Sequence, residues 1–129
     1  MILLPVTLTT AAAAALLNFW LGLRVGQVRA SEKISVGDGG NLRLIARMRA
    51  QLNFAEYTPI VLILLGLVEL ARGESLYLWG VALIYVVGRV LHAFGMDGFT
   101  AGRAIGTATT MLTMIGLAVY AALLAYRVI

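Results

Sequence analysis

The 129-residue sequence contains no cysteine, a single histidine and only two prolines. Without cysteine the chain cannot form a disulfide, a thiolate metal site or a cysteine nucleophile. Any thiol chemistry therefore requires a thiol that a substrate supplies, and we expect no metal site.

Charged residues are also scarce. They make up 12% of the chain, about half of the roughly 25% found in soluble domains, whereas 61% of the residues are hydrophobic. The apolar residues form four blocks, each with about the 20 residues that a spanning helix needs. The composition therefore predicts an all-α integral membrane protein, a four-transmembrane-helix bundle formed by a single domain over residues 1–129.

We expect the four helices at about residues 2–23, 42–71, 75–95 and 103–127, with a polar loop over residues 24–41. Asn41 is a good N-cap residue for the second helix. Six of the ten basic residues lie between Arg24 and Arg49, and the positive-inside rule assigns such a cluster to the cytoplasm. Both termini are then predicted to be non-cytoplasmic. The cluster is too short for a nucleic-acid surface, so we expect no nucleic-acid partner.

One polar run, RAQLNFAEYTP, lies in the second apolar block. Arg49, Asn53 and Glu56 are spaced i, i+4 and i+7, so they share a helix face, with Tyr57 beside it and Gln51 off this stripe. Polar side chains in a membrane helix usually face a bundle interior or a watery cavity. The run therefore predicts one wall of a cleft.

The third and fourth blocks carry further cations. Arg89 and His92 are spaced i, i+3, and the simplest partner for Arg89 is Glu56 at a similar depth, a pair that could serve only to lock two helices together. His92 could equally be an interior histidine. Arg103 opens the fourth block and could simply set topology, while Gly102 and Gly106 permit close backbone approach.

Several cations and amides near the cytoplasmic face suit a small anion that carries carboxylates, because the planar fork of arginine binds carboxylates well. The bilayer beside them can supply a lipophilic second substrate. From the residues alone, an anionic cytosolic ligand is expected to meet an apolar partner at the membrane boundary.

The motifs as a set resemble the MAPEG family, the membrane-associated proteins in eicosanoid and glutathione metabolism. The resemblance rests on GQVR near the end of the first helix, RAQxNxxEYxP in the second, GRVxH in the third and the arginine that opens the fourth. The loop sequence GDGG is similar to that of bacterial inner-membrane members, which implies a bacterial inner (plasma) membrane location.

The resemblance implies a homotrimer that binds glutathione between neighbouring subunits near the cytosolic side. Arg103 matches the arginine proposed to stabilise the glutathione thiolate, so it is the expected catalytic residue. The positions that match glutathione-binding residues are Arg29, Arg49, Gln51, Asn53, Glu56, Tyr57, Arg89 and His92. Among them, Arg29 matches a basic position that contacts the glutathione carboxylate from the adjacent subunit.

The sequence departs from eicosanoid-forming members at three positions. Met96 replaces a tyrosine that contacts glutathione, Leu52 replaces an arginine, and Ala104 follows Arg103 where several members have serine. The resemblance therefore favours a glutathione-dependent transferase or peroxidase that acts on a lipophilic small molecule. Two alternatives remain: a non-catalytic membrane protein of the same fold that binds another anion or lipid or acts as a scaffold, and a small four-helix proton-coupled exporter.

Overall fold

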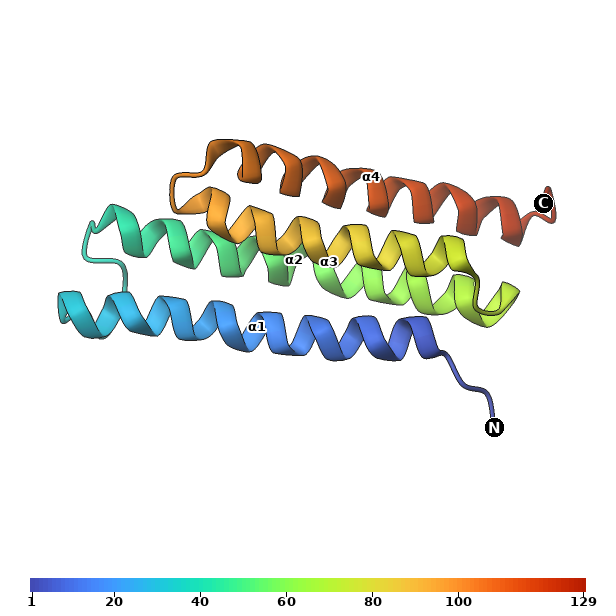
Figure 1. Cartoon of the computed structure of the whole chain (residues 1–129), viewed down its shortest axis with the longest axis horizontal. Coiled ribbons are helices and arrows are strands. Elements are labelled where there is room, and N and C mark those ends of the chain that lie inside the picture. Colours follow the sequence, from blue (N-terminus) through green and yellow to red (C-terminus); the bar gives the residue numbers. More distant parts are fainter.

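The computed structural model describes all 129 residues, which form an antiparallel bundle of four helices (Figure 1). The helices are α1 (Pro5–Glu32), α2 (Leu42–Arg72), α3 (Leu76–Met96) and α4 (Thr100–Ala125). This architecture confirms the expected all-α four-helix fold.

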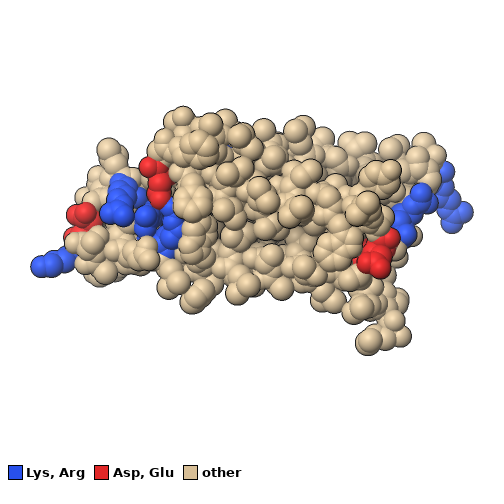
Figure 2. Space-filling view, viewed as in Figure 1, with Lys and Arg blue, Asp and Glu red and all other residues tan.

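The bundle has two chemically different ends. The basic end holds the α1–α2 loop (residues 33–41) and the α3–α4 turn (residues 97–99), and the terminal end holds the α2–α3 loop (residues 73–75) together with both chain termini (Figure 1). On the face drawn in Figure 2, charged side chains gather at these two ends and the broad band between them carries none.

All four helices are long and apolar enough to cross a membrane. Only 28 of the 129 residues are buried, while large apolar side chains such as Leu16, Leu83 and Leu112 are exposed. An apolar surface of this extent needs a cover other than water, and lipid supplies one. The chain is a multi-pass membrane protein.

The helices differ in how closely they pack. α2 and α3 each contact all the other helices, whereas α1 and α4 lie on opposite sides of the bundle and do not contact each other (Figure 1). α3 and α4 approach each other most closely, because glycines of both helices lie at the contact between them. A Cβ atom at Gly106 would lie 2.5 Å from the carbonyl oxygen of Gly88, and one at Gly95 would overlap the backbone of Arg103. The small residues around Arg103 therefore allow a close helix contact.

The first helix is longer than the sequence predicted. It ends at Glu32 rather than near residue 23, and Lys33 follows in the left-handed conformation with φ 55°. Val25 and Val28 form a small core cluster with Leu44 of α2, which holds these additional turns against the bundle. The expected loop over residues 24–41 is therefore wrong, and the actual loop is confined to residues 33–41.

Two helix ends are capped by side chains in different ways. The Asn41 side chain accepts a hydrogen bond from the Leu44 amide at 3.0 Å, as expected of an N-cap. α1 has no such local cap at Leu4. Instead the Glu69 carboxylate of α2, 1% exposed, accepts hydrogen bonds from the amides of Val6 at 2.9 Å and Thr7 at 2.8 Å.

Candidate functional site

Three of the predicted ligand residues line one depression. We call it the α1–α2 groove: it has a volume of about 580 Å³ and lies between α1 and α2 toward the basic end. Its lining residues are Asn18, Val25, Arg29, Asp38, Ile45, Met48, Arg49, Gln51, Leu52 and Ala55. Within one copy of the chain the structure thus brings Arg29, Arg49 and Gln51 together, whereas the resemblance implies that Arg29 contacts glutathione from the adjacent subunit.

The two cations of the groove are used differently. The Arg29 guanidinium donates to the carbonyl oxygens of Gly37 at 2.8 Å and Ile34 at 3.3 Å, so it holds the α1–α2 loop in place. The Arg49 side chain is exposed and forms no ion pair. Arg49 is therefore the cation of the groove that is free to meet an anion.

One groove residue was not predicted from the sequence. Asp38 lies in the α1–α2 loop, where its side chain accepts a hydrogen bond from the Gly40 amide at 2.8 Å. Its carboxylate also borders the groove, so that one acidic and two basic side chains line the same depression. A ligand with both carboxylate and ammonium groups would find partners for both there.

A second group of predicted residues lies inside the bundle. Arg89, 3% exposed, donates to the Asn53 side-chain oxygen at 2.8 Å and to the Thr110 hydroxyl at 3.0 Å. Its guanidinium also lies 5.8 Å from the centre of the Phe54 ring. These bonds join α2, α3 and α4 through a buried cation whose hydrogen-bond partners are neutral.

The expected Arg89–Glu56 pair is wrong. Glu56 is exposed and forms no ion pair. Residues three apart on a helix differ by about 60° around its axis, so the rotation of α2 that turns Asn53 toward Arg89 turns Glu56 outward. The stripe of Arg49, Asn53 and Glu56 is consequently divided between the bundle interior and its outer surface.

The remaining predicted residues lie in separate places. His92 is buried, and its Nδ1 atom has no hydrogen-bond partner. Tyr57 is half-buried on α2. Arg103 is exposed in the first turn of α4, at the basic end, and forms no ion pair. Because α1 and α4 do not touch, one copy of the chain does not assemble Arg103 and the α1–α2 groove into a single site.

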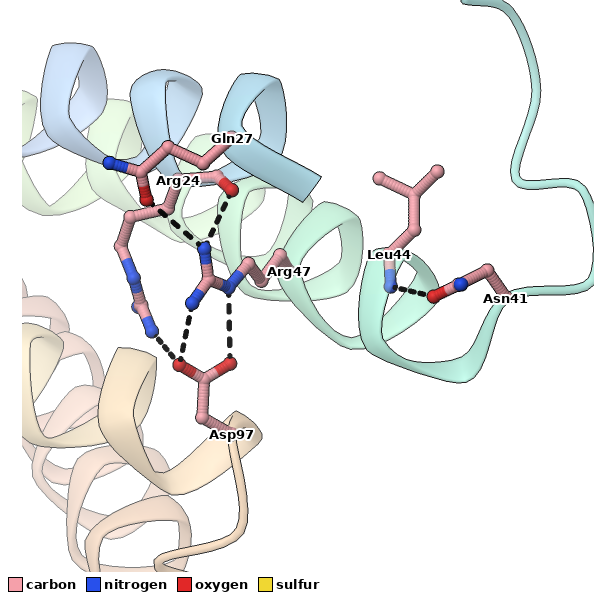
Figure 3. Close-up of polar contacts among 6 residues, drawn as sticks. All are labelled: Arg24, Gln27, Asn41, Leu44, Arg47 and Asp97. Carbon is pink, nitrogen blue, oxygen red and sulfur yellow. Dashed lines mark hydrogen bonds and ion pairs between the residues drawn. The ribbon is translucent and has the colours of Figure 1, made fainter. Parts of the chain in front are cut away.

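A further polar cluster at the basic end was not predicted (Figure 3). Arg24 of α1, 6% exposed, and Arg47 of α2 both contact the Asp97 carboxylate, with Arg47 Nε at 3.4 Å. Arg47 also donates to the Arg24 carbonyl oxygen at 2.8 Å and to the Gln27 side chain at 3.3 Å. The cluster ties α1 and α2 to the α3–α4 turn.

The aromatic surroundings of Arg24 explain why an arginine is tolerated within this helix. Its guanidinium lies 4.8 Å from the Trp20 ring centre and 5.3 Å from that of Phe94. Cation–π contacts of this kind partly compensate for lost hydration. The partners of Asp97 are 73 and 50 residues away in sequence, so no local spacing could have revealed the cluster.

Comparisons with known proteins point to a membrane-protein family and to an inner membrane protein. The model of the MAPEG family matches residues 7–123. The chain is also similar to the "Inner membrane protein YecN" of Escherichia coli strain K12 and of an Escherichia coli O6:H1 strain, at 28% identity over 85 residues in each case. The matched region covers 66% of this chain and 65% of each relative, just under two thirds of their length.

Proposed function

Because the chain belongs to the MAPEG family, we propose that it is a glutathione-dependent membrane transferase or peroxidase. It would activate the glutathione thiol for attack on a lipophilic electrophile or hydroperoxide. The observation that carries this proposal is the α1–α2 groove, where Arg29, Arg49 and Gln51, all assigned to glutathione by the family motifs, line one depression. We further propose that the basic end faces the cytoplasm of a bacterial inner membrane.

The charges of the groove suit glutathione. The tripeptide carries two carboxylates and one ammonium group at neutral pH, and the groove offers the free guanidinium of Arg49 and the carboxylate of Asp38. Arg49 can hold a carboxylate by two parallel hydrogen bonds, and Asp38 can accept from the ammonium group. A volume of about 580 Å³ is in the usual range for small-molecule sites.

A homotrimer would complete the site. The groove lies on the α1–α2 side of the bundle, whereas Arg103 is on α4, which does not touch α1. Contacting surfaces on different sides of a subunit produce a head-to-tail ring when the rotation closes. In such a ring the α4 helix of one copy would meet the groove of its neighbour, and Arg103 would approach the ligand from the second subunit.

Arg103 then supplies the activation. A free thiol is mostly protonated at pH 7, and only the thiolate is a good nucleophile. A cation close to the sulfur favours the thiolate, and a tenfold rise in its share requires only about 1.4 kcal/mol. The exposed Arg103 side chain, which forms no ion pair within its own copy, has its charge free for this purpose.

The second substrate would reach the site from the bilayer. Attack of the thiolate on an electrophilic carbon forms a C–S bond and expels the leaving group or gives an adduct. Attack on a hydroperoxide breaks the O–O bond, which yields an alcohol and the sulfenic acid of glutathione. A second glutathione then reduces the sulfenic acid, giving the disulfide and water.

Arg103→Ala tests the assigned role. With saturating glutathione, the ultraviolet absorbance of the bound thiolate should be lost, while size-exclusion chromatography shows an unchanged oligomer. Arg43→Ala is the matched control, because Arg43 is also exposed at the basic end and does not line the groove. A thiolate signal as strong in Arg103→Ala as in Arg43→Ala would refute the role of Arg103.

One alternative has an observation in its favour. Met96 cannot donate the hydrogen bond of the tyrosine found in eicosanoid-forming relatives, and Arg29 is already bonded to its own loop. A non-catalytic membrane protein of the same fold, which binds another anion or lipid or acts as a scaffold, would share both features. It would form the same oligomer, yet glutathione would not stabilise it.

A further inference from the structure

A second depression lies toward the terminal end of the bundle. This α3–α4 groove has a volume of about 760 Å³ and is lined mainly by α3 and α4, with the end of α2 closing it. Its walls are mostly apolar, formed by side chains such as Val81, Ile84, Leu112 and Leu117. The Thr109 hydroxyl, which also borders it, donates to the Gly106 carbonyl oxygen at 3.1 Å, so this donor is already used within α4.

The length of the α3–α4 groove matches one leaflet of a bilayer. Along α4 it runs from Thr109 to Tyr120, and the eleven steps between these residues span about 16 Å at 1.5 Å per step. One leaflet contributes about 15 Å, half of a hydrocarbon core of about 30 Å. A groove of this length that opens at the membrane surface of the terminal end would reach about the middle of the bilayer.

The mouth of the groove carries a positive charge. Arg72, in the last turn of α2, is exposed and lines the groove beside Tyr77. Both ion pairs of the chain involve Asp97 at the other end, so Arg72 has no carboxylate partner. Arginine and tyrosine are the side chains that anchor a membrane protein at headgroup level. At headgroup level the Arg72 cation would be at the depth of a lipid phosphate, and the apolar walls would be at the depth of its acyl chains.

We propose that the α3–α4 groove is a binding site for an anionic phospholipid of the leaflet at the terminal end. One acyl chain lies between α3 and α4, and the headgroup phosphate meets Arg72. The site is at the opposite end of the bundle from the α1–α2 groove, so this proposal does not depend on glutathione binding.

The glycines of the chain provide a matched pair of variants. A Cβ at Gly116, which lines the α3–α4 groove, would meet no other atom within 4 Å, and the same holds at Gly80 of α3, which does not line it. Gly116→Leu should fill the groove without disturbing the bundle, and Gly80→Leu should leave it open. Arg72→Gln removes the charge at the mouth, and Arg127→Gln removes a charge that is not part of the groove.

The test is native mass spectrometry after reconstitution into vesicles with equal amounts of dioleoylphosphatidylglycerol and dioleoylphosphatidylcholine. The wild type and Arg127→Gln should retain phosphatidylglycerol about fivefold over phosphatidylcholine, the effect of about 1 kcal/mol per interfacial arginine. Arg72→Gln should lose this preference. Gly116→Leu should retain much less of both lipids than Gly80→Leu.

Three results would overturn the proposal. One is equal lipid retention by Gly116→Leu and Gly80→Leu, and another is an unchanged headgroup preference in Arg72→Gln. The third is a smaller oligomer for Gly116→Leu alone, which would mean that a second copy of the chain occupies the groove.

Discussion

Replacing Glu69 with glutamine tests how α1 is held at the terminal end. The Glu69 carboxylate is buried and accepts three hydrogen bonds, from the amides of Val6 and Thr7 and from the Thr7 hydroxyl at 2.6 Å. These amides belong to the first turn of α1, where an N-cap side chain would ordinarily accept. Leu4, which occupies the N-cap position, provides no such acceptor.

The size of the effect follows from these bonds. Glutamine keeps one acceptor oxygen and places an NH₂ group against donors, so at least one buried amide loses its partner, at about 1–3 kcal/mol. Removing a negative charge from a buried helix N-terminus costs up to about 2 kcal/mol more. We expect Glu69→Gln to lower the free energy of unfolding by about 1–5 kcal/mol.

The assay is unfolding in detergent followed by circular dichroism, with amide hydrogen exchange at Val6 and Thr7 as a local readout. Glu74→Gln is the control, because it removes the same charge from an exposed position at the same end. Faster exchange at both amides together with the loss of stability supports the cap. If Glu69→Gln were as stable as Glu74→Gln, the reasoning would be refuted.

Three further predictions concern packing, the cluster around Asp97 and topology. Gly106→Ala should destabilise the bundle by about 1–3 kcal/mol through overpacking, because its Cβ would lie 2.8 Å from the His92 backbone. If an unfolding titration found Gly106→Ala as stable as Gly80→Ala, the close contact would be contradicted. Asp97→Asn should lower the free energy of unfolding by about 2 kcal/mol in the same titration. The loss is smaller than for a fully buried ion pair, because the Asp97 side chain is 27% exposed. An unchanged unfolding midpoint would show that the cluster adds no stability. A reporter active only in the periplasm, fused to either terminus, should give a signal, and cytoplasmic termini would contradict the assigned orientation.

The four apolar blocks were sufficient to predict the fold, but not where α1 ends. Arg24 follows a charge-free run, so composition placed it in a loop. In the structure it is buried within the helix, because Asp97 compensates its charge and two aromatic rings cover it. Those partners come from the other half of the chain, and a local pattern cannot reveal them.

The candidate site shows a similar limit. Helical spacing predicted one common face for Arg49, Asn53 and Glu56, but it could not give the rotation of α2 about its own axis, and the structure divides these residues between interior and surface. The rotation decides that Asn53, and not Glu56, meets Arg89. The sequence also gave no indication that the loop carrying Asp38 folds back over α1 and α2 to border the groove with Arg29 and Arg49.

The most direct test of glutathione binding is a thermal-shift titration of the detergent-solubilised protein with glutathione. A ligand that binds only the folded state stabilises it by mass action, by about 2.7 kcal/mol at one hundred times its dissociation constant. We predict a saturable rise in Tm at millimolar glutathione that Arg49→Ala removes and Arg43→Ala retains. No rise in the wild-type Tm at millimolar glutathione would contradict glutathione binding and favour the non-catalytic alternative.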